Sequence, residues 1–485
     1  MGNYIALLNL KPKTDNMSKI NPTKKSTSFA EEKLAGGFGM KSAKQDNISL
    51  LKRVVLANLL WENVAYVDGE SVSNEIVRLI PLCSPKDVAE LAIEARKAQK
   101  LRHTPLFICV EMLKHKEHAL LVKNILPQII TRADMITDFV ALYKKQNGGK
   151  LKPIANSAKI GLAKSFENFD EYQFAKYDRN SEIKLRDVMF LVRPKPSQDR
   201  EELYKKIANR ELKVPDTWEV ALSTGKDKKE TWTRLIKEAK LGGLAMLRNI
   251  RNMKDAKVDK KVIVDGLSAL KTQMLLPLNF LASARINTEF EREIEDAMIK
   301  GYERLPKLSG KTLFIVDVSG SMGSLTSGQS QFSRLDQACA MAMLAVNQCE
   351  DYKVVATAGD DGRRTGAHKY IEYPKKGFGV FEQIVMSRKE IGGGGIFTRQ
   401  CLEWCKANVG DDFDRIIVFS DSQDCDIVNK VPSPFAKYNY ICDVSANTRG
   451  VNFKGKWTAE ISGWSEHFIT YISAMEGLNN NFIEQ

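Results

Sequence analysis

The sequence predicts a two-part fold: a long all-helical region followed by an α/β domain built on a parallel sheet. The first observation is size, because 485 residues with 43% hydrophobic content suffice for more than one buried core. The second is the helical spacing of apolar residues, three and four positions apart, from about Leu50 to Tyr302. The third is the alternation of strand-like and helical runs after Tyr302, which is typical of a parallel sheet with helices on both faces.

The helical region is a succession of short segments whose joints contain Pro, Asp or Gly. Short helices of this kind cannot bury their apolar faces alone, so we expect them to stack in antiparallel pairs as an irregular helical-repeat solenoid. The segments that carry the pattern are "ISLLKRVVLANLLW", "SNEIVRLIPLC", "PKDVAELAIEARKAQ", "TPLFICVEMLK", "HALLVKNILPQII", "MITDFVALYKKQ" and "TWTRLIKEAK".

The chain divides into three segments by composition and pattern. Residues 1–48 are polar and rich in lysine, and we expect an N-terminal arm there. Residues 49–305 form the helical-repeat domain, and residues 306–485 form the α/β domain. The strand-like runs of the α/β domain are Leu313 to Val316, Lys353 to Ala356, Ile416 to Phe419 and Tyr440 to Asp443.

Charge and composition narrow the class of partner and the compartment. A net charge of +13 and a pI near 9.1 favour a polyanionic partner, either nucleic acid or an anionic membrane surface. No apolar run reaches the ~20 residues of a membrane-spanning helix, and no secretory pattern is present, so we expect a cytoplasmic protein. The eight cysteines are scattered, and we expect buried reduced thiols.

The stretch "KTLFIVDVSGSMGSL" ends an apolar run with an acid and two hydroxyls at alternate positions: Asp317, Ser319 and Ser321. Ligands of parallel sheets bind at the carboxyl ends of the strands, and Asp317 follows such an end directly. A second acid, Asp421, follows the strand-like run Ile416 to Phe419. Carboxylate and hydroxyl oxygens suit Mg²⁺ or Mn²⁺, so the sequence predicts a divalent-metal site at this edge.

Three other interpretations of the same stretch are weaker. A phosphate-binding P-loop requires Gly-Lys-Ser/Thr after the glycines, and this sequence lacks it. A phosphatase-type aspartyl nucleophile usually has a second acid two residues on, where Ser319 stands. A purely structural Ser/Gly turn explains the loop but leaves the second acid at a strand end without a role.

These residues resemble the metal-ion-dependent adhesion site of von Willebrand factor A domains. That pattern is D-x-S-x-S, a Thr after a Gly-rich turn, and an Asp after a strand, and Asp317, Ser319, Ser321 and Asp421 match it. In "IGGGGIFT", Ile396 stands where the family commonly has the Thr. Either Thr398 reaches the ion through a longer loop, or this ligand is absent and the ion binds more weakly. The resemblance implies adhesion, in which an acidic side chain of a partner completes the coordination.

The helical half has a resemblance of its own. "AQKLRHTPLF", "AKYDRNSEIKLRDVMFLVRPKP", "TWEVALSTGKDKKETW" and "GGLAMLRNIRNM" are similar to the TROVE module of the Ro 60-kDa autoantigen and its bacterial relatives. The order of the two parts matches this family over nearly the whole chain. The resemblance implies a HEAT-like ring of helical repeats whose ends are joined by a Rossmann-like von Willebrand factor A domain. Members bind Y RNAs on the outer surface and single-stranded ends of misfolded RNA through the hole.

The residues themselves also favour RNA. The segment from "KKQNGGKLKP" to "RPKPSQDR" is basic, with Phe and Tyr interleaved, so it offers charge for phosphates and rings for unpaired bases. Acids in the same segment dilute it, and a solvated helix face is the alternative. The predicted phosphate contacts are Lys159, Lys164, Lys176, Arg179, Lys184 and Arg186, with Arg102 and His103 beside an RNA path. His103 suits a structural role in a helix cap equally well.

We therefore expect a ribonucleoprotein that binds Y-like noncoding RNA and acts as a scaffold in RNA quality control. No nucleophile with a base, and no paired general acid and base, emerges from the sequence, so we expect no enzymatic activity. An exoribonuclease or another protein is the partner expected at the metal site, and a closed ring predicts a monomer. Leu185 stands where animal Ro proteins have a histidine, which implies that RNA recognition differs in detail. The alternative is a metal-dependent protein-adhesion module on a helical scaffold, with incidental RNA binding.

Overall fold

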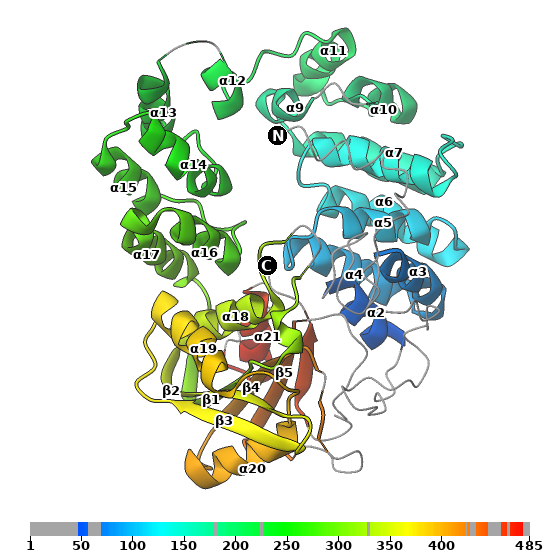
Figure 1. The fold of residues 1–485 in the computed structure, drawn as a ribbon. Coiled ribbons are helices and arrows are strands. Elements are labelled where there is room, and N and C mark those ends of the chain that lie inside the picture. Colours follow the sequence, from blue (N-terminus) through cyan, green and yellow to red (C-terminus); the bar gives the residue numbers. More distant parts are fainter. Residues whose placement is uncertain are drawn as a thin grey trace, which may run out of the picture.

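The structure is a computed structural model, and its helices form an arc whose two ends meet the α/β domain (Figure 1). This closed ring of helices with an α/β domain confirms the predicted fold class. The expected N-terminal arm lies outside the described residues except for positions 47 and 48. The described residues are 47–56, 69–178, 182–223, 225, 227–326, 330–422, 424–426, 433–444, 457–462 and 466–478.

The first half of the ring runs up one side of the molecule and has a hydrophobic core of its own, from Leu50 to Ile207. Local signals begin its helices: Ser84 caps α4 through its hydroxyl, and Asp170 forms a capping box with Gln173 on α9. The elements are α2 (Asn47–Leu56), α3 (Gly69–Leu79), η1 (Ile80–Leu82), α4 (Pro85–Lys97), α5 (His103–Met112), α6 (Lys116–Ile129), α7 (Asp134–Gln146), α8 (Asn156–Ser165), η2 (Phe166–Asn168), α9 (Glu171–Tyr177), α10 (Leu185–Val192), η3 (Gln198–Arg200) and α11 (Glu201–Asn209).

The second half of the ring shares its core with the α/β domain. Its apolar residues, Trp232 and Phe280 among them, belong to one cluster with the helices that cover one face of the sheet. The chain crosses from the first half through residues 210–217, which form no helix. The elements are α12 (Trp218–Ser223), α13 (Lys228–Lys237), α14 (Gly243–Asp255), α15 (Lys260–Ser268), α16 (Pro277–Ile286), η4 (Thr288–Phe290) and α17 (Glu291–Tyr302).

The α/β domain begins with β1 (Leu308–Asp317), so the change of pattern expected near residue 305 falls between α17 and β1. Its described sheet has six strands in the order β3-β2-β1-β4-β5-β6, all parallel to their neighbours except β3, which pairs antiparallel with β2. The other elements are β2 (Cys349–Asp360), β3 (Thr365–Ile371), β4 (Arg415–Ser420), β5 (Tyr438–Asp443), β6 (Ala459–Ser462), η5 (Ser321–Gly323), α18 (Arg334–Gln348), α19 (Phe378–Ile391), α20 (Thr398–Asn408) and α21 (His467–Met475).

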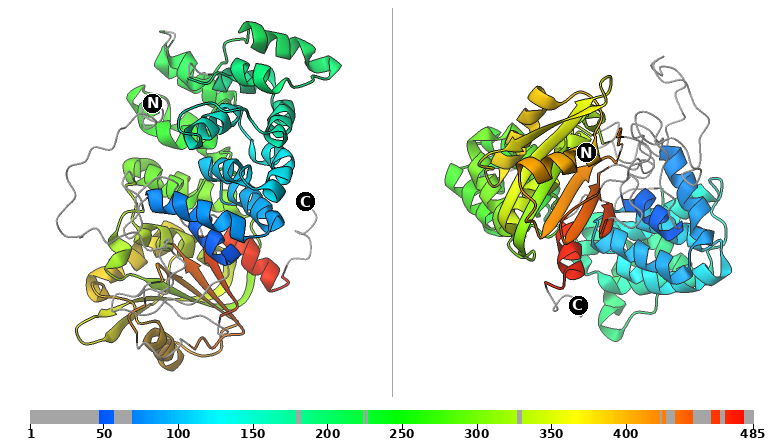
Figure 2. Two further views of the ribbon diagram at one scale, coloured as in Figure 1. Left: turned by 90° about the vertical axis from the view of Figure 1, so that its right-hand side faces the viewer. Right: turned by 90° about the horizontal axis from the view of Figure 1, so that it is seen from below.

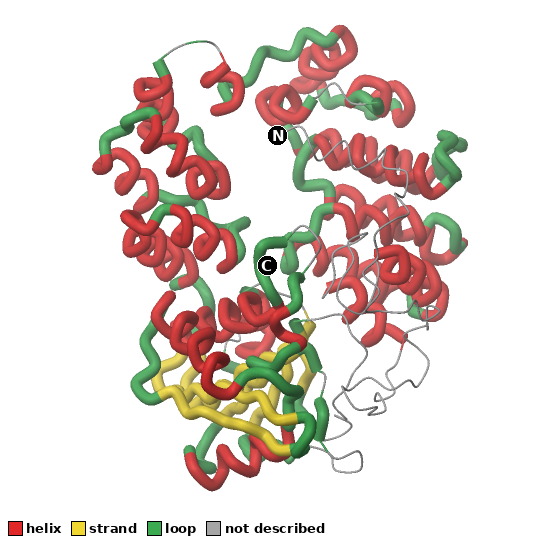
Figure 3. Tube along the Cα trace, viewed as in Figure 1, coloured by secondary structure: helices red, strands yellow, loops and turns green. Residues whose placement is uncertain are grey.

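The two faces of the sheet are covered by different helices (Figure 3). Phe314 and Val316 on β1 point into the core shared with α18, α19 and α21, whereas Leu313 and Ile315 point to the smaller cluster under α20. This alternation is the period of a strand that is buried on both faces. Because β1 is central, with Val316 in register with Phe419 of β4, the ends of β1 and β4 lie side by side at one edge.

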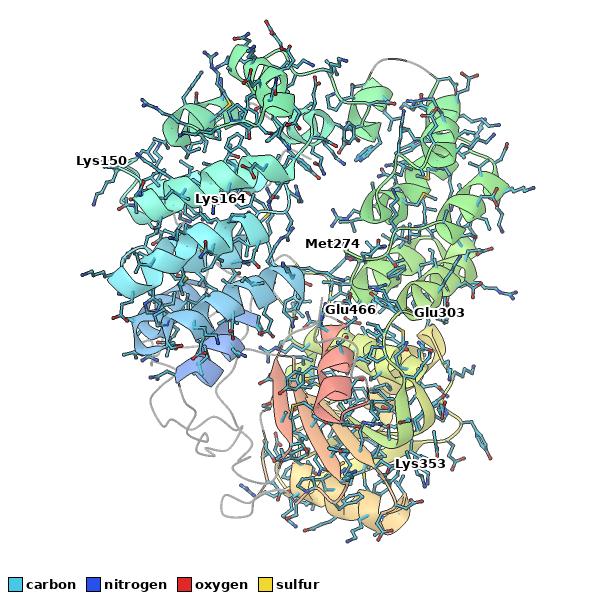
Figure 4. The ribbon with its side chains drawn as sticks, turned by 180° about the vertical axis from the view of Figure 1, so that it is seen from behind. Lys150, Lys164, Met274, Glu303, Lys353 and Glu466 are labelled. Atoms are coloured by element: carbon cyan, nitrogen blue, oxygen red, sulfur yellow. The ribbon has the colours of Figure 1, made fainter. Side chains whose placement is uncertain are left out.

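The ring closes where its first half meets both the second half and the α/β domain. Lys100, between α4 and α5, donates hydrogen bonds from Nζ to the Glu466 carboxylate and to the Leu275 carbonyl, the latter at 3.2 Å. Arg304, after α17, also donates to Glu466 at 3.2 Å. The side chains of Lys100 and Glu466 are 6% and 3% exposed, so one buried carboxylate joins three parts of the chain (Figure 4).

Two further expectations concern the membrane and the cysteines. Within the described part of the chain, no helix is long and apolar enough to cross a bilayer. All eight cysteines are buried and free, as expected of reduced thiols.

The first helices, coloured blue, lie beside the C-terminal strands and α21, coloured orange and red (Figure 2).

Candidate functional site

The D-x-S-x-S loop folds over the end of β1. The buried Asp317 carboxylate accepts hydrogen bonds from the backbone N–H of Ser319 (2.8 Å) and from the hydroxyl of Ser420 (2.7 Å) at the end of β4. The hydroxyl oxygens of Ser319 and Ser321 lie 3.2 Å apart. The structure thus brings these three predicted ligands together at the carboxyl edge of the sheet.

The second predicted acid, Asp421, follows β4 directly and is fully buried. Burial, together with the negative charge of Asp421, raises the pKa of Asp317 to about 7. The two carboxylates therefore share one desolvated site, in which a cation lowers the electrostatic cost of ionising both. The Arg334 guanidinium contacts Asp421, with a nitrogen 3.0 Å from the carboxylate oxygen.

The glycine-rich turn before α20 lies directly over the D-x-S-x-S loop. The Gly320 N–H donates to the Gly394 carbonyl at 2.9 Å, and a Cβ on Gly320 would stand 2.8 Å from the Gly393 carbonyl oxygen. Only glycine at position 320 permits this approach of the two backbones. The turn thereby brings the start of α20, and with it Thr398, to the same edge of the sheet.

Thr398 is the first residue of α20 and is 2% exposed. Its N–H donates to Asp424 at 3.2 Å, while its hydroxyl oxygen makes no hydrogen bond of standard geometry within the described residues and lies near enough to Asp424 to offset part of the pKa rise that burial causes in that acid. Ile396 is buried and its carbonyl accepts the Cys425 N–H at 2.7 Å, so its side chain is packing. Of the two candidate positions, Thr398 is the one that places a buried hydroxyl at this edge.

The donor set fits a small divalent cation. It consists of two carboxylates and three hydroxyls, which are hard oxygen ligands, and the orphaned Thr398 hydroxyl is a buried polar atom in need of a partner. A third buried acid, Asp424, has its pKa raised to about 7 by burial. In the part of the chain that the structure describes, no group of three or more His, Cys, Asp or Glu could hold a metal. A bound ion would therefore depend on the hydroxyls and on retained water.

The sequence pattern did not reveal three residues of this site: Arg334, Ser420 and Asp424. Ser420 and Asp424 stand in "IIVFSDSQD", so a closer inspection of that strand end would have found them. Arg334 opens α18, which follows the D-x-S-x-S loop, and nothing in its local sequence indicates a buried ion pair with Asp421. Only the packing of α18 against the sheet brings the two together.

The predicted RNA contacts lie in two places. Lys159, Lys164, Lys176, Lys184 and Arg186 belong to α8, α9 and the start of α10, and α8 packs against α10 (Figure 4 labels Lys164). We call these five residues the basic surface. Arg102 and His103 open α5, close to Lys100 and the ring closure. Arg179 lies outside the described residues.

The two places differ in how their charges are neutralised. No residue of the basic surface forms an ion pair with a described acid, whereas neighbours such as Lys206, 2.9 Å from Glu171, do. Arg102 donates to both Asp134 and Asp138 at 2.7 Å. The cations of the basic surface are therefore available for phosphate, and the Arg102 charge serves the fold.

Exposed aromatic rings accompany the basic surface. Tyr172 is 42% exposed and Phe190 is 53% exposed. The Lys176 ammonium lies 5.8 Å from the Tyr172 ring centre, and the Arg186 guanidinium lies 5.3 Å from that of Phe190. This pairing of cations with open ring faces suits unpaired bases and their phosphates. Leu185 is buried in the core, so its side chain presents no group to a ligand.

Together these features define a class: a ring of helices closed by an α/β domain with a mostly parallel sheet. Residues 208–303 match the family model of the TROVE domain. Among solved structures, the crystal structure of the Deinococcus radiodurans RO (RSR) protein has a TM-score of 0.56 and 15% sequence identity, covering 89% of this chain and 99% of that one. At this identity the likeness shows a shared fold. A search of curated proteins found no match.

Proposed function

We propose that this protein binds structured noncoding RNA of the Y-RNA type and single-stranded RNA ends, as a scaffold in RNA quality control. The observation that carries the proposal is the basic surface, whose unpaired cations stand beside the exposed rings of Tyr172 and Phe190. The TROVE match and the ring fold support the same conclusion. The protein has no catalytic role in this proposal and acts as a monomer, which sedimentation of RNA-free protein tests.

The chemistry of the basic surface favours single strands over duplex. A-form duplex buries its base faces, so an aromatic ring finds no stacking partner along it, and the contacts are to phosphate and sugar. An unpaired end offers both phosphates for the lysines and bases for the rings. We expect a 3′ single-stranded tail to pass through the ring while the structured body of the RNA rests outside.

The test compares one hairpin RNA with and without a 3′ single-stranded tail at two salt concentrations. We expect the tailed form to bind more tightly, and replacement of Lys159, Lys164 and Arg186 by Ala to weaken it. Since each phosphate contact on a single strand contributes a slope of about 0.7, the triple variant should flatten the salt dependence by about two. Lys206→Ala, which removes a lysine already paired with Glu171, is the control and should bind as the wild type does. Equal affinity for both RNAs would refute threading.

We propose in addition that Asp317, Ser319, Ser321, Thr398 and Asp421 hold Mg²⁺ or Mn²⁺, directly or through water. The ion would supply a positive centre for an acidic side chain of a protein partner, such as an exoribonuclease. Asp317→Ala removes a central charged ligand, and we expect lost divalent-ion binding with unchanged RNA affinity, measured by calorimetry. An equal fall in RNA affinity would place the ion on the RNA and contradict protein adhesion.

The second candidate function is metal-dependent protein adhesion, with RNA binding incidental. The buried carboxylates and the orphaned Thr398 hydroxyl favour it, because they indicate a built site in the α/β domain. Protein recovered without nuclease treatment separates the two. A high ratio of absorbance at 260 nm to that at 280 nm supports RNA as the resident ligand, and its absence supports adhesion.

A further inference from the structure

Arg334 occupies an unusual place for a guanidinium. It is the first residue of α18, whose start is fixed by a capping box between Ser333 and Asp336. Its side chain is 2% exposed and lies 3.0 Å from the carboxylate of Asp421, which is 0% exposed. Burying an arginine is costly unless a partner compensates its charge. The fold thus holds a positive charge inside the predicted metal site.

The neighbouring arginines do not share this role. Arg388 donates to the Gly320 carbonyl at 3.2 Å, and Arg399 pairs with Asp426 at 3.1 Å. Arg285, on α16, pairs with Asp336 of α18 at 2.6 Å and is 46% exposed. Arg334, in contrast to these three arginines, contacts Asp421, an acid of the predicted ligand set.

The charge balance of the site indicates what this contact does. When an ion is bound and both ligand carboxylates are ionised, Asp317 and Asp421 contribute two negative charges, and Arg334 offsets one of them. The neighbouring acid Asp424 is present with or without Arg334. Without Arg334 a divalent ion would meet two negative charges in the same buried site. Coulomb energies are large at such distances in a desolvated environment, so this difference acts strongly on ion affinity.

We propose that Arg334 is a built-in counter-ion of the metal site: it keeps the α/β domain folded without a divalent ion and weakens the binding of that ion. The proposal rests on the metal site of the proposed function. Arg334 in this role makes the α/β domain tolerant of metal depletion, and it makes adhesion by that domain dependent on the ion concentration. An arginine that only oriented Asp421 would do the opposite, because its loss would weaken ion binding.

The test uses the full-length chain and Mn²⁺ as the probe, with binding followed by electron paramagnetic resonance. We expect Arg334→Gln, which removes the charge, to bind Mn²⁺ at least tenfold more tightly, equivalent to about 1.4 kcal/mol. Arg334→Lys keeps the charge and should bind within threefold of the wild type. Arg285→Gln removes a partly exposed guanidinium of α16 that pairs with Asp336, and it controls for net charge.

Thermal unfolding of the same proteins provides a second readout. The wild type should unfold at nearly the same temperature in EDTA and in Mn²⁺, whereas Arg334→Gln should unfold much earlier in EDTA and recover in Mn²⁺. Unchanged or weaker Mn²⁺ binding by Arg334→Gln would overturn the proposal. So would Mn²⁺ binding by neither protein, or a wild type that EDTA destabilises as much as the variant. RNA affinity, measured in parallel, reports separately on the proposed RNA function.

Discussion

Glu466→Gln should open the ring. The Glu466 carboxylate is the acid that the buried Lys100 ammonium contacts, and Lys100 has the Leu275 carbonyl as its second partner. The substitution keeps the size of the side chain but leaves an ammonium that is 6% exposed without a counter-charge. Arg304, 38% exposed, also loses its acid, although water can solvate it in part.

The magnitude follows from the burial. Removal of one partner of a buried ion pair costs about 3–5 kcal/mol. We expect a cost at the lower end of this range, because Lys100 retains a carbonyl acceptor. The closed state should therefore lose ~3 kcal/mol of stability relative to the open state, which lowers the ratio of closed to open molecules roughly a hundredfold. The cost falls on the closure, because the core of the first half is separate from the core that joins the second half to the α/β domain.

Hydrogen exchange, followed by mass spectrometry, measures the loss of stability at the ring closure peptide by peptide. Peptides that contain the end of α4, where the Leu101 N–H donates to Ala95, and the start of α21, where Ile469 donates to Glu466, should exchange faster in the variant. Peptides from α13, which lies away from the ring closure (Figure 1), should be unchanged. Glu303→Gln, which removes an exposed acid beside Arg304, is the matched control (Figure 4). Closure peptides that exchange as in the wild type would refute the inference that this ion cluster holds the ring.

Two further predictions concern the α5 region and the glycine turn. Burial raises the pKa of Asp138, but the hydrogen bond from His103 and the charge of Arg102 outweigh burial, so the pKa of Asp138 is lowered overall. The ionised carboxylate therefore stabilises the fold above about pH 4. This contribution to stability is lost as the pH falls through the folded-state pKa. Urea unfolding should show Asp138→Asn less stable than the wild type at pH 6, with the difference in stability narrowing as the pH falls below about 4; equal stability at pH 6 would exclude the contribution. Gly320→Ala should lower the free energy of unfolding by about 1–3 kcal/mol and weaken Mn²⁺ binding, because the new methyl group would clash with the Gly393 carbonyl oxygen. An unchanged melting temperature would show that the glycine turn moves to accommodate the methyl group.

The features that the sequence predicted correctly are those that neighbouring residues determine. The helical period and the position of Asp317 after an apolar run are set by neighbouring residues, and both are found in the structure. The closure could not be predicted, because Lys100 and Glu466 stand 366 residues apart and no local pattern indicates that the two side chains meet. The contact between Arg334 and Asp421 could not be predicted for the same reason, because the two residues are 87 positions apart. Long-range ion pairs depend on packing, which no short pattern records.

The division of the cores determines how the two proposed sites influence one another. The basic surface belongs to the first half, with its own core, and the metal site belongs to the unit formed by the second half and the α/β domain. The two cores are separate, and the closure between the units includes the polar cluster at Glu466, so we expect little coupling between the sites. Combining Asp317→Ala with the Lys159, Lys164 and Arg186 substitutions should therefore give additive effects on RNA binding and on Mn²⁺ binding. A coupling above about 0.5 kcal/mol in that double-mutant cycle would mean that the closure transmits occupancy between the sites.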